Sequence, residues 1–202
     1  MKPWSLIVLL VAGLSLGPLA HARDGGSRWR RHVVNRPATQ FTLTNQDGHR
    51  IGLTELRGKV ILMTFIYTNC PEACPLITGK VAEIHESFKK DVVLLSVSID
   101  PDHDTPETLK EYGRRFHADF SRWHFLVGTP DESDRVQAAY QVPLRRKKER
   151  DANGRVIGAT IVDHGAKVFL VDRQGRVRFE YWGHEFDTKA VKRDLAALLR
   201  ER

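Results

Sequence analysis

The two cysteines of this chain, Cys70 and Cys74, are the residues whose type and spacing point most directly to chemistry. They lie in the run Tyr67-Thr-Asn-Cys-Pro-Glu-Ala-Cys-Pro75, after an apolar segment and before a segment with helical periodicity. Two thiols so close at a strand-to-helix junction can bind one soft metal ion, or they can form a disulfide with each other. A purely structural disulfide across so short a loop would restrict the unfolded chain very little, so the spacing favours a metal-binding or redox role.

Prolines follow both cysteines and constrain the start of the expected helix. Pro75 has no N–H to donate, and it disfavours helical dihedral angles at Cys74. We therefore expect the regular helix to begin at Pro75, with Cys74 beside its N-terminus. Backbone N–H groups and the helix dipole at that end would favour the thiolate form of Cys74.

The N-terminus carries the features of a secretory signal peptide. Lys2 precedes an almost wholly apolar run over residues 6–16, and Ala20-His21-Ala22 offers small residues for cleavage. The run is short for a membrane-spanning helix, which needs about 20 residues, but an uncleaved anchor stays open as an alternative. In either case we expect residues 1–22 to direct export of the folded part.

The remaining chain is long enough for one domain with its own core, and its formal net charge is +7 before any cleavage. We expect a basic tether over residues 23–37 and one domain over residues 38–202. Basic residues gather at 28–32 and 145–150. Either cluster can meet an anionic partner or a membrane surface, and the alternative is a solvated tail and loop. Nucleic acid is not expected as a partner, because no aromatic platform accompanies these charges.

Hydrophobic periodicity predicts alternating strands and helices after an N-terminal hairpin that turns at Asp47-Gly48. Start signals at Thr105-Pro106 and Thr129-Pro130, and Asp187 near the C-terminus, predict three helices in addition to the one after the cysteines. A basic hairpin turning at residues 151–154 is inserted before a closing hairpin. We expect strands at residues 60–67, 92–99, 123–127, 167–171 and 176–181. This order predicts an α/β three-layer sandwich.

The cysteine motif after the first long buried strand, with a late hairpin and helix, resembles the thioredoxin superfamily. Within it, the chain resembles the Sco/SenC family over residues 41–179, on three blocks in the right order: Tyr67-Thr-x-Cys-Pro-Glu-x-Cys-Pro75, Asp100-Pro-x-x-Asp-Thr-Pro-Glu107, and Asp163-His164 ahead of Phe169-Leu-Val-Asp172. The resemblance implies a thioredoxin-like fold. It also implies a copper chaperone for the dinuclear copper centre of cytochrome c oxidase, although some members are held to be thiol-disulfide reductants for that centre.

A third copper ligand is expected beside the cysteines. Copper(I) is soft and prefers thiolates, while an imidazole completes a site that also tolerates copper(II). His164 is the best candidate, because it opens the strand-like segment at residues 167–171, and in a thioredoxin-like sheet that strand starts beside the cysteine loop. The alternative interpretation is a hydrogen-bonded surface histidine.

Two carboxylates are candidates for supporting this set. Asp163 can orient His164, since metal-bound histidines need a partner for their second nitrogen. Asp100, at the end of the neighbouring strand, can approach the cysteine loop and tune the thiols. The alternatives are a turn cap for Asp163 and a simple strand end for Asp100. Ala166 stands where thioredoxin-like reductases carry a cis-proline that holds substrate backbone, which favours metal binding over disulfide reduction.

Three functions stay open at this point. The first is a copper metallochaperone, which is not an enzyme, acting on the copper-bearing subunit of cytochrome c oxidase or on another copper protein. The second is a thiol-disulfide oxidoreductase using Cys70 and Cys74, and the third is a redox or copper sensor. The expected location is the periplasm, or the outer face of the inner membrane if the N-terminal segment stays as an anchor.

Overall fold

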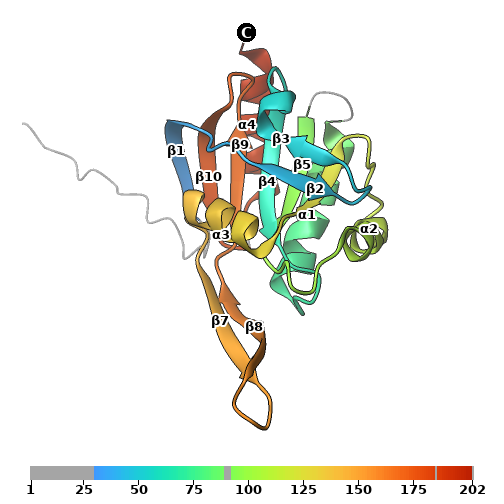
Figure 1. Ribbon diagram of the computed structural model, residues 1–202. Coiled ribbons are helices and arrows are strands. Elements are labelled where there is room, and N and C mark those ends of the chain that lie inside the picture. The colour runs from blue at the N-terminus through green and yellow to red at the C-terminus, as the bar shows by residue number, and fades with distance from the viewer. Residues whose placement is uncertain (1–29, 89–91, 185, 202) are drawn as a thin grey trace, which may run out of the picture.

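The computed structural model describes residues 30–88, 92–184 and 186–201, which form an eight-stranded sheet and a separate two-stranded hairpin (Figure 1). The strand order in the large sheet is β1-β10-β9-β4-β5-β6-β2-β3. The strands of the large sheet are β1 (Arg30–Pro37), β2 (Thr42–Asn45), β3 (Arg50–Gly52), β4 (Val60–Ile66), β5 (Val92–Ser98), β6 (Trp123–Val127), β9 (Lys167–Val171) and β10 (Arg176–Trp182). The hairpin consists of β7 (Leu144–Arg150) and β8 (Val156–His164).

The centre of the sheet is parallel and buried on both faces. β4 pairs in parallel with β5, and β5 with β6, while β9 runs antiparallel to β4. All seven residues of β4 are buried, as its unbroken apolar sequence predicts for a strand covered on both sides. The strands predicted at residues 60–67 and 92–99 are therefore confirmed.

Helices cover both faces of this sheet, which gives three layers (Figure 1). The apolar side chains of α1 (Ala73–Ser87), α2 (Pro106–Arg115) and α4 (Thr188–Arg200) share one core with the side of the sheet that they cover. A second core on the opposite face contains residues of α3 (Pro130–Ala139) and of the short 3-10 helix η1 (Leu53–Leu56). Residues of β4 alternate between the two cores, as expected for a strand between two layers. The predicted three-layer sandwich is confirmed.

The predicted helix starts are also confirmed by their caps. Thr105 and Thr129 both form capping boxes, and each is followed by proline at the first helical position. The side chain of Asp187 accepts a hydrogen bond from the backbone N–H of Lys189 at the start of α4. These local bonds satisfy donors that a helix N-terminus leaves without partners.

Two boundaries differ from the sequence prediction. Helix α1 begins at Ala73, not at Pro75. Pro75 is tolerated in the first turn because that turn needs no N–H from it. The second difference concerns the segment expected to be a tether over residues 23–37. Residues 30–37 of it form edge strand β1, antiparallel to β10.

The expected signal peptide, residues 1–22, and residues 23–29 lie outside the part of the chain that the structure describes. Among the described residues, none of the helices is both long enough and apolar enough to span a bilayer.

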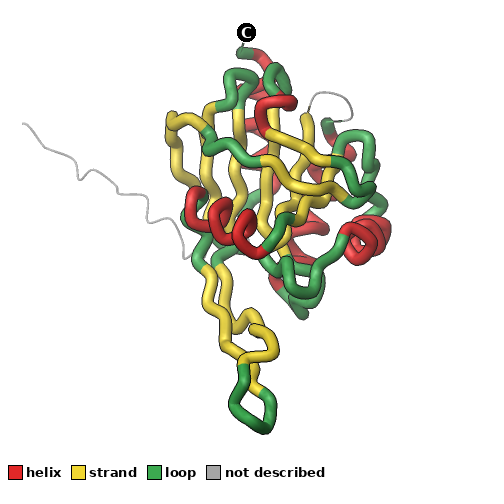
Figure 2. The backbone as a smooth tube through the Cα atoms, viewed as in Figure 1, coloured by secondary structure: helices red, strands yellow, loops and turns green. Residues whose placement is uncertain are grey.

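The predicted basic hairpin is confirmed and projects from the body of the molecule (Figure 2). At its tip, the backbone N–H of Asp151 donates to the carbonyl of Arg155 at 2.9 Å, and Gly154 supplies the positive φ of 79° that the turn requires. Strand β8 returns to the body and ends at His164.

Candidate metal centre

The two cysteines lie between the end of β4 and the first turn of α1, facing the protein interior. Both side chains are buried, with exposed fractions of 7% for Cys70 and 0% for Cys74. The backbone N–H of Cys74 donates to Cys70 Sγ at 3.3 Å. This hydrogen bond from the first turn of the helix holds the sulfur of Cys70 close to Cys74. The backbone N–H of Cys70 donates to the carbonyl of Tyr67 at 3.3 Å, which closes the loop. The structure thus brings the two predicted thiols together.

The electrostatics of this pair differ from the sequence expectation. Hydrogen bonding with Cys70 and burial raise the pKa of the Cys74 thiol, although the backbone of Tyr67 acts in the opposite direction. The expectation that the helix N-terminus favours the Cys74 thiolate is therefore wrong for the metal-free protein. The physical reason is that one buried thiolate disfavours a second beside it and finds little water to solvate it.

Two tyrosines flank the thiols and stay protonated. Burial, and then the neighbouring Cys70, raise the pKa of the Tyr67 hydroxyl, and burial raises the pKa of the Tyr112 hydroxyl. Tyr112 Oη lies 3.0 Å from the hydroxyl of Thr78, which in turn donates to the carbonyl of Cys74 at 2.8 Å. The thiols therefore lie in a buried setting, beside two protonated hydroxyls, that suits a soft cation once the thiol protons are displaced.

A buried carboxylate, Asp104, holds the cysteine loop to the end of β5. It accepts hydrogen bonds from the hydroxyls of Thr68 and Ser98, each at 2.5 Å, and from the backbone N–H of Thr68 at 3.2 Å. Burial raises its pKa, while these hydrogen bonds lower it in part. Sequence reasoning assigned Asp104 no role in the metal site. Its place inside the Asp100-Pro-x-x-Asp-Thr-Pro-Glu107 block is the signal that would have identified it.

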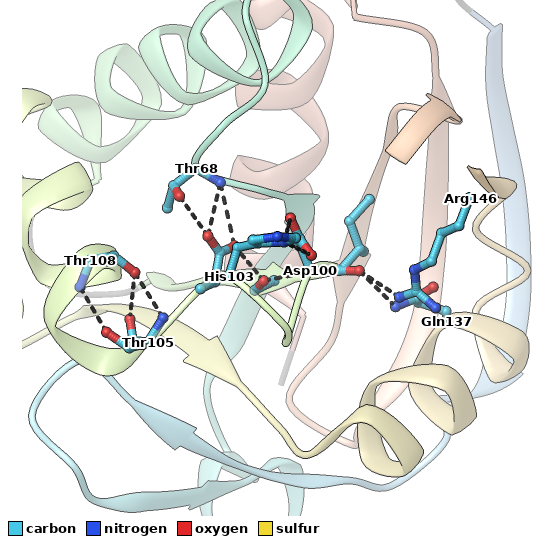
Figure 3. A network of polar contacts seen from close by, with 10 residues as sticks. Thr68, Asp100, His103, Thr105, Thr108, Gln137 and Arg146 are labelled. Atoms are coloured by element: carbon cyan, nitrogen blue, oxygen red, sulfur yellow. Dashed lines mark hydrogen bonds and ion pairs between the residues drawn. The ribbon is translucent and has the colours of Figure 1, made fainter. Parts of the chain in front are cut away.

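Asp100 has a different partner from the one considered for it. Its carboxylate lies 2.9 and 3.0 Å from Nδ1 of His103, on the loop that follows β5 (Figure 3). It is 5% exposed, and its charge contributes to the raised pKa of Tyr67. Asp104 therefore bonds the cysteine loop directly, and the charge of Asp100 also acts on that loop at Tyr67.

The backbone places His164 at the end of the hairpin, opposite Leu144, with Asp163 opposite Arg145. The side chains of both residues lie outside the described part of the structure. The expectation that His164 opens the next strand is wrong, because it closes β8, and Gly165 and Ala166 precede β9. Among the side chains that are described, no group of three histidine, cysteine or acidic residues is arranged to hold a metal.

The chain around residue 164 nevertheless returns to the cysteine loop. Thr64 of β4 pairs with Val168 of β9, so β9 begins where β4 ends and the cysteine loop leaves the sheet. Ala166 packs against the core that contains both cysteines. The backbone N–H of Gly165 donates to the carbonyl of Pro143 at 2.7 Å, and a Cβ at Gly165 would lie 2.5 Å from the Pro143 ring. Only glycine allows this close return of the chain.

Comparisons with known proteins agree with this architecture. The profile of the SCO1/SenC family matches residues 32–200. The "SCO1 protein homolog" of Bacillus subtilis is 31% identical over 79% of this chain and 81% of its own length. The solved structure of Bradyrhizobium japonicum ScoI with copper bound is 28% identical, with a TM-score of 0.65, covering 80% of this chain and 99% of that one.

A third relative connects the fold with redox chemistry. The structure of BsSco, described as a Sco family member of the cytochrome c oxidase assembly proteins with a disulfide switch, is 27% identical. Its TM-score is 0.67, and the match covers 84% of this chain and 97% of that one. These structural matches confirm the predicted thioredoxin-like fold. With a family profile that covers most of its length, this chain belongs to the SCO1/SenC family.

Proposed function

We propose that the protein is an exported copper-binding metallochaperone that delivers copper to, or prepares, the dinuclear copper centre of cytochrome c oxidase. The observation that carries the proposal is the pair of buried cysteines, Cys70 and Cys74, linked by an N–H to sulfur hydrogen bond at 3.3 Å. The family relationship supports it, since relatives have been solved with copper bound and one is described among oxidase assembly proteins.

Copper is the cargo of this protein. The residues that bind it in this proposal are Cys70, Cys74 and His164. Two sulfurs suit copper(I), and the imidazole nitrogen extends the site to copper(II). The raised pKa of Cys74 means that copper binding must displace a proton that the free protein holds. Asp163, the residue before His164, is proposed to orient the imidazole.

Thiol-disulfide exchange is the second candidate function, because the same two thiols lie close enough to interact. Closing the pair removes two electrons and two protons, which the disulfide of an oxidised partner protein would accept. One contact argues against disulfide reduction as the main role. The carbonyl of Ala166 already accepts a hydrogen bond from the backbone N–H of Gly183 at 2.9 Å, so it is not available to bind the backbone of a substrate protein.

The test of the main proposal is copper stoichiometry and X-ray absorption of the reduced protein. We expect one copper per chain with sulfur scatterers, and loss of tight binding when Cys70→Ser is combined with Cys74→Ser. Both replacements keep the side-chain size, and circular dichroism serves as the control for folding. Copper binding by the double variant as tight as that of the native chain would contradict the assignment.

The location of the protein is part of the proposal. The signal-like residues 1–22 support export to the periplasm, with the folded domain on the outer face of the inner membrane if this segment remains attached. Pulse-labelling with detection of the processed form distinguishes cleavage from anchoring.

A further inference from the structure

The β7–β8 hairpin carries a concentration of positive charge that copper binding does not use. Residues 144–155 contain six basic and two acidic side chains, and four of the basic side chains that the structure describes are exposed: Arg145, Lys147, Arg150 and Arg155. The carboxylate of Asp151 accepts the backbone N–H groups of Asn153 and Arg155, each at 2.9 Å. The tip of the hairpin is thus a strongly cationic surface.

This hairpin is attached to the body only near its base. β7 and β8 form their own two-stranded sheet, separate from the large sheet, and project away from it (Figure 1). At the base, Arg146 donates to the carbonyl of Ile99 at 2.8 Å and pairs with Asp134 at 2.9 Å. Ile161 is buried in the core beside α3. Two-stranded ribbons are marginally stable in water, so the outer part of this one is suited to lie on another surface.

The start of the described chain lies at the same end of the sheet as the hairpin base. Arg30 of β1 pairs with Trp182 of β10, and Trp182 pairs with Lys167, the first residue of β9. The apolar N-terminal segment, which we propose directs export and can serve as an anchor, is separated from Arg30 by residues 23–29. These residues span at most about 25 Å when fully extended. The seven-residue strand β7 extends a similar distance, about 23 Å.

We propose that the tip of the β7–β8 hairpin docks on the anionic phospholipid surface of the membrane, with the exposed basic side chains binding lipid phosphates. The short connection to the N-terminal segment brings the hairpin end of the domain toward any bilayer that holds that segment. The cationic tip matches the negative surface of such a bilayer. Docking would fix the orientation of the cysteine loop, which leaves the sheet at this same end, relative to the membrane.

The first test measures binding of metal-free protein lacking residues 1–22 to vesicles. All described elements and both cores lie within residues 30–201, so this deletion leaves every described element in place. We expect binding to vesicles of equal parts phosphatidylglycerol and phosphatidylcholine, and none to phosphatidylcholine alone. Replacing Lys147, Arg150 and Arg155 by Gln should weaken binding about 100-fold, since each basic residue near the surface contributes about fivefold.

A matched control removes the same charge from the opposite end of the molecule. Arg57 and Lys59, exposed before β4, and Arg200, exposed at the end of α4, are replaced by Gln. This triple variant should bind anionic vesicles within about twofold of the native chain, because its charges are more than a Debye length from the bilayer. Equal weakening in both triple variants would overturn the proposal. So would the absence of vesicle binding, which would leave an acidic protein surface as the partner of the hairpin.

The second test locates the contact. In the Cys70→Ser, Cys74→Ser background, an environment-sensitive fluorophore is attached through Asn153→Cys at the hairpin tip, or through Gln174→Cys in the β9–β10 turn. Both positions are exposed in turns, but they lie on different hairpins. Anionic vesicles should shift the emission of the Asn153 label to the blue and leave the Gln174 label unchanged. A shift at Gln174 alone, or at neither position, would overturn the proposal. Because these measurements use metal-free protein, their failure is independent of the copper proposal.

Discussion

The cysteine loop and the β7–β8 hairpin meet at the same end of the sheet, but the structure holds them in different ways. The cysteine loop is buried and tied to β5 by three hydrogen bonds from Thr68 and Ser98 to Asp104. The hairpin carries His164 at its inner end and is joined to the body chiefly through Arg146, Ile161 and the turn at Gly165. The proposed ligand set therefore combines a braced pair of thiols with a histidine on a less restrained element.

This difference suggests a division of labour in copper transfer. The thiols are buried in the core, whereas the residue proposed as the third ligand ends a hairpin that forms its own two-stranded sheet. A chaperone must bind its cargo and then release it, so a third ligand outside the buried thiol pair would be useful. The following predictions test this contrast between the cysteine-loop half and the hairpin half of the site.

The largest effect is expected from His164→Ala. It removes the proposed third ligand and leaves both thiols in place, so copper(II) affinity should fall about 1000-fold, equivalent to about 4 kcal/mol. Copper(I) affinity should fall less, because the two sulfurs remain. Competition titrations with a copper chelator measure both values.

The matched control for His164→Ala is His117→Asn at an exposed histidine with a φ of 53°, a conformation that asparagine accepts well. It should leave copper affinity unchanged. In cells without the native gene, we expect His164→Ala to fail to restore oxidase activity at limiting copper. Full complementation by this variant would favour the thiol-disulfide reductase function instead.

The next effect concerns the braced half of the site. Asp104→Ala leaves the hydroxyls of Thr68 and Ser98 and the Thr68 N–H without their buried acceptor, so unfolding free energy should fall by about 3 kcal/mol. Denaturant unfolding of the metal-free protein measures this loss. Asp102→Ala, at an exposed position in the same loop, should change stability by less than about 0.5 kcal/mol. Equal stabilities for the two variants would show that the loop is not braced by Asp104.

A smaller effect is expected at the hairpin base. Arg146→Gln removes the bonds to the Ile99 carbonyl and to Asp134, so the hairpin should open more often and copper affinity should fall about fivefold. Hydrogen exchange in β8 should become faster while global stability stays nearly constant. Arg135→Gln on α3 is the matched control, because it removes the same charge from an exposed position one residue from Asp134. If Arg146→Gln changes neither exchange nor copper affinity, the hairpin is held by other contacts.

Much of the cysteine loop and its supporting elements was predictable, because the sequence signals for them are local. The unbroken apolar run of β4, the capping threonines 105 and 129, and the paired cysteines each identify an element within a few residues of sequence. The role of Asp104 was not predicted, because it depends on Thr68 lying across from it in space. The same applies to β1, a polar segment whose strand pairing depends on β10, far along the chain. The position of His164 at the end of β8 was missed because only Gly165 and Ala166 separate β8 from β9, so the boundary between the two strands leaves no periodic signal.

The smallest effect tests whether β1 belongs to the domain, in place of the tether expected there. Arg31 Nε donates to Asp194 on α4 at 2.5 Å, and Tyr181 also bonds this carboxylate. Burial alone would raise the pKa of Asp194, but Arg31 and Tyr181 outweigh it, and the pKa is lowered. A lowered carboxylate pKa stabilises the fold above the unfolded value of about 3.9, and this contribution is lost as the pH falls through the folded value.

Arg31→Gln should therefore reduce unfolding free energy by about 1 kcal/mol at neutral pH, a modest figure because Arg31 is partly exposed to solvent. The difference from the native chain should shrink as the pH falls below the unfolded value of about 3.9 and through the lower folded value, beneath which Asp194 is protonated in both proteins. Arg193→Gln is the matched control, since its guanidinium lies 3.7 Å from the other oxygen of Asp194 and is 67% exposed. It should have little effect at any pH. Equal, pH-independent effects of the two variants would mean that β1 adds no specific charge pairing to the domain, and the restraint on the hairpin end of the sheet would then come from β9 and β10 alone.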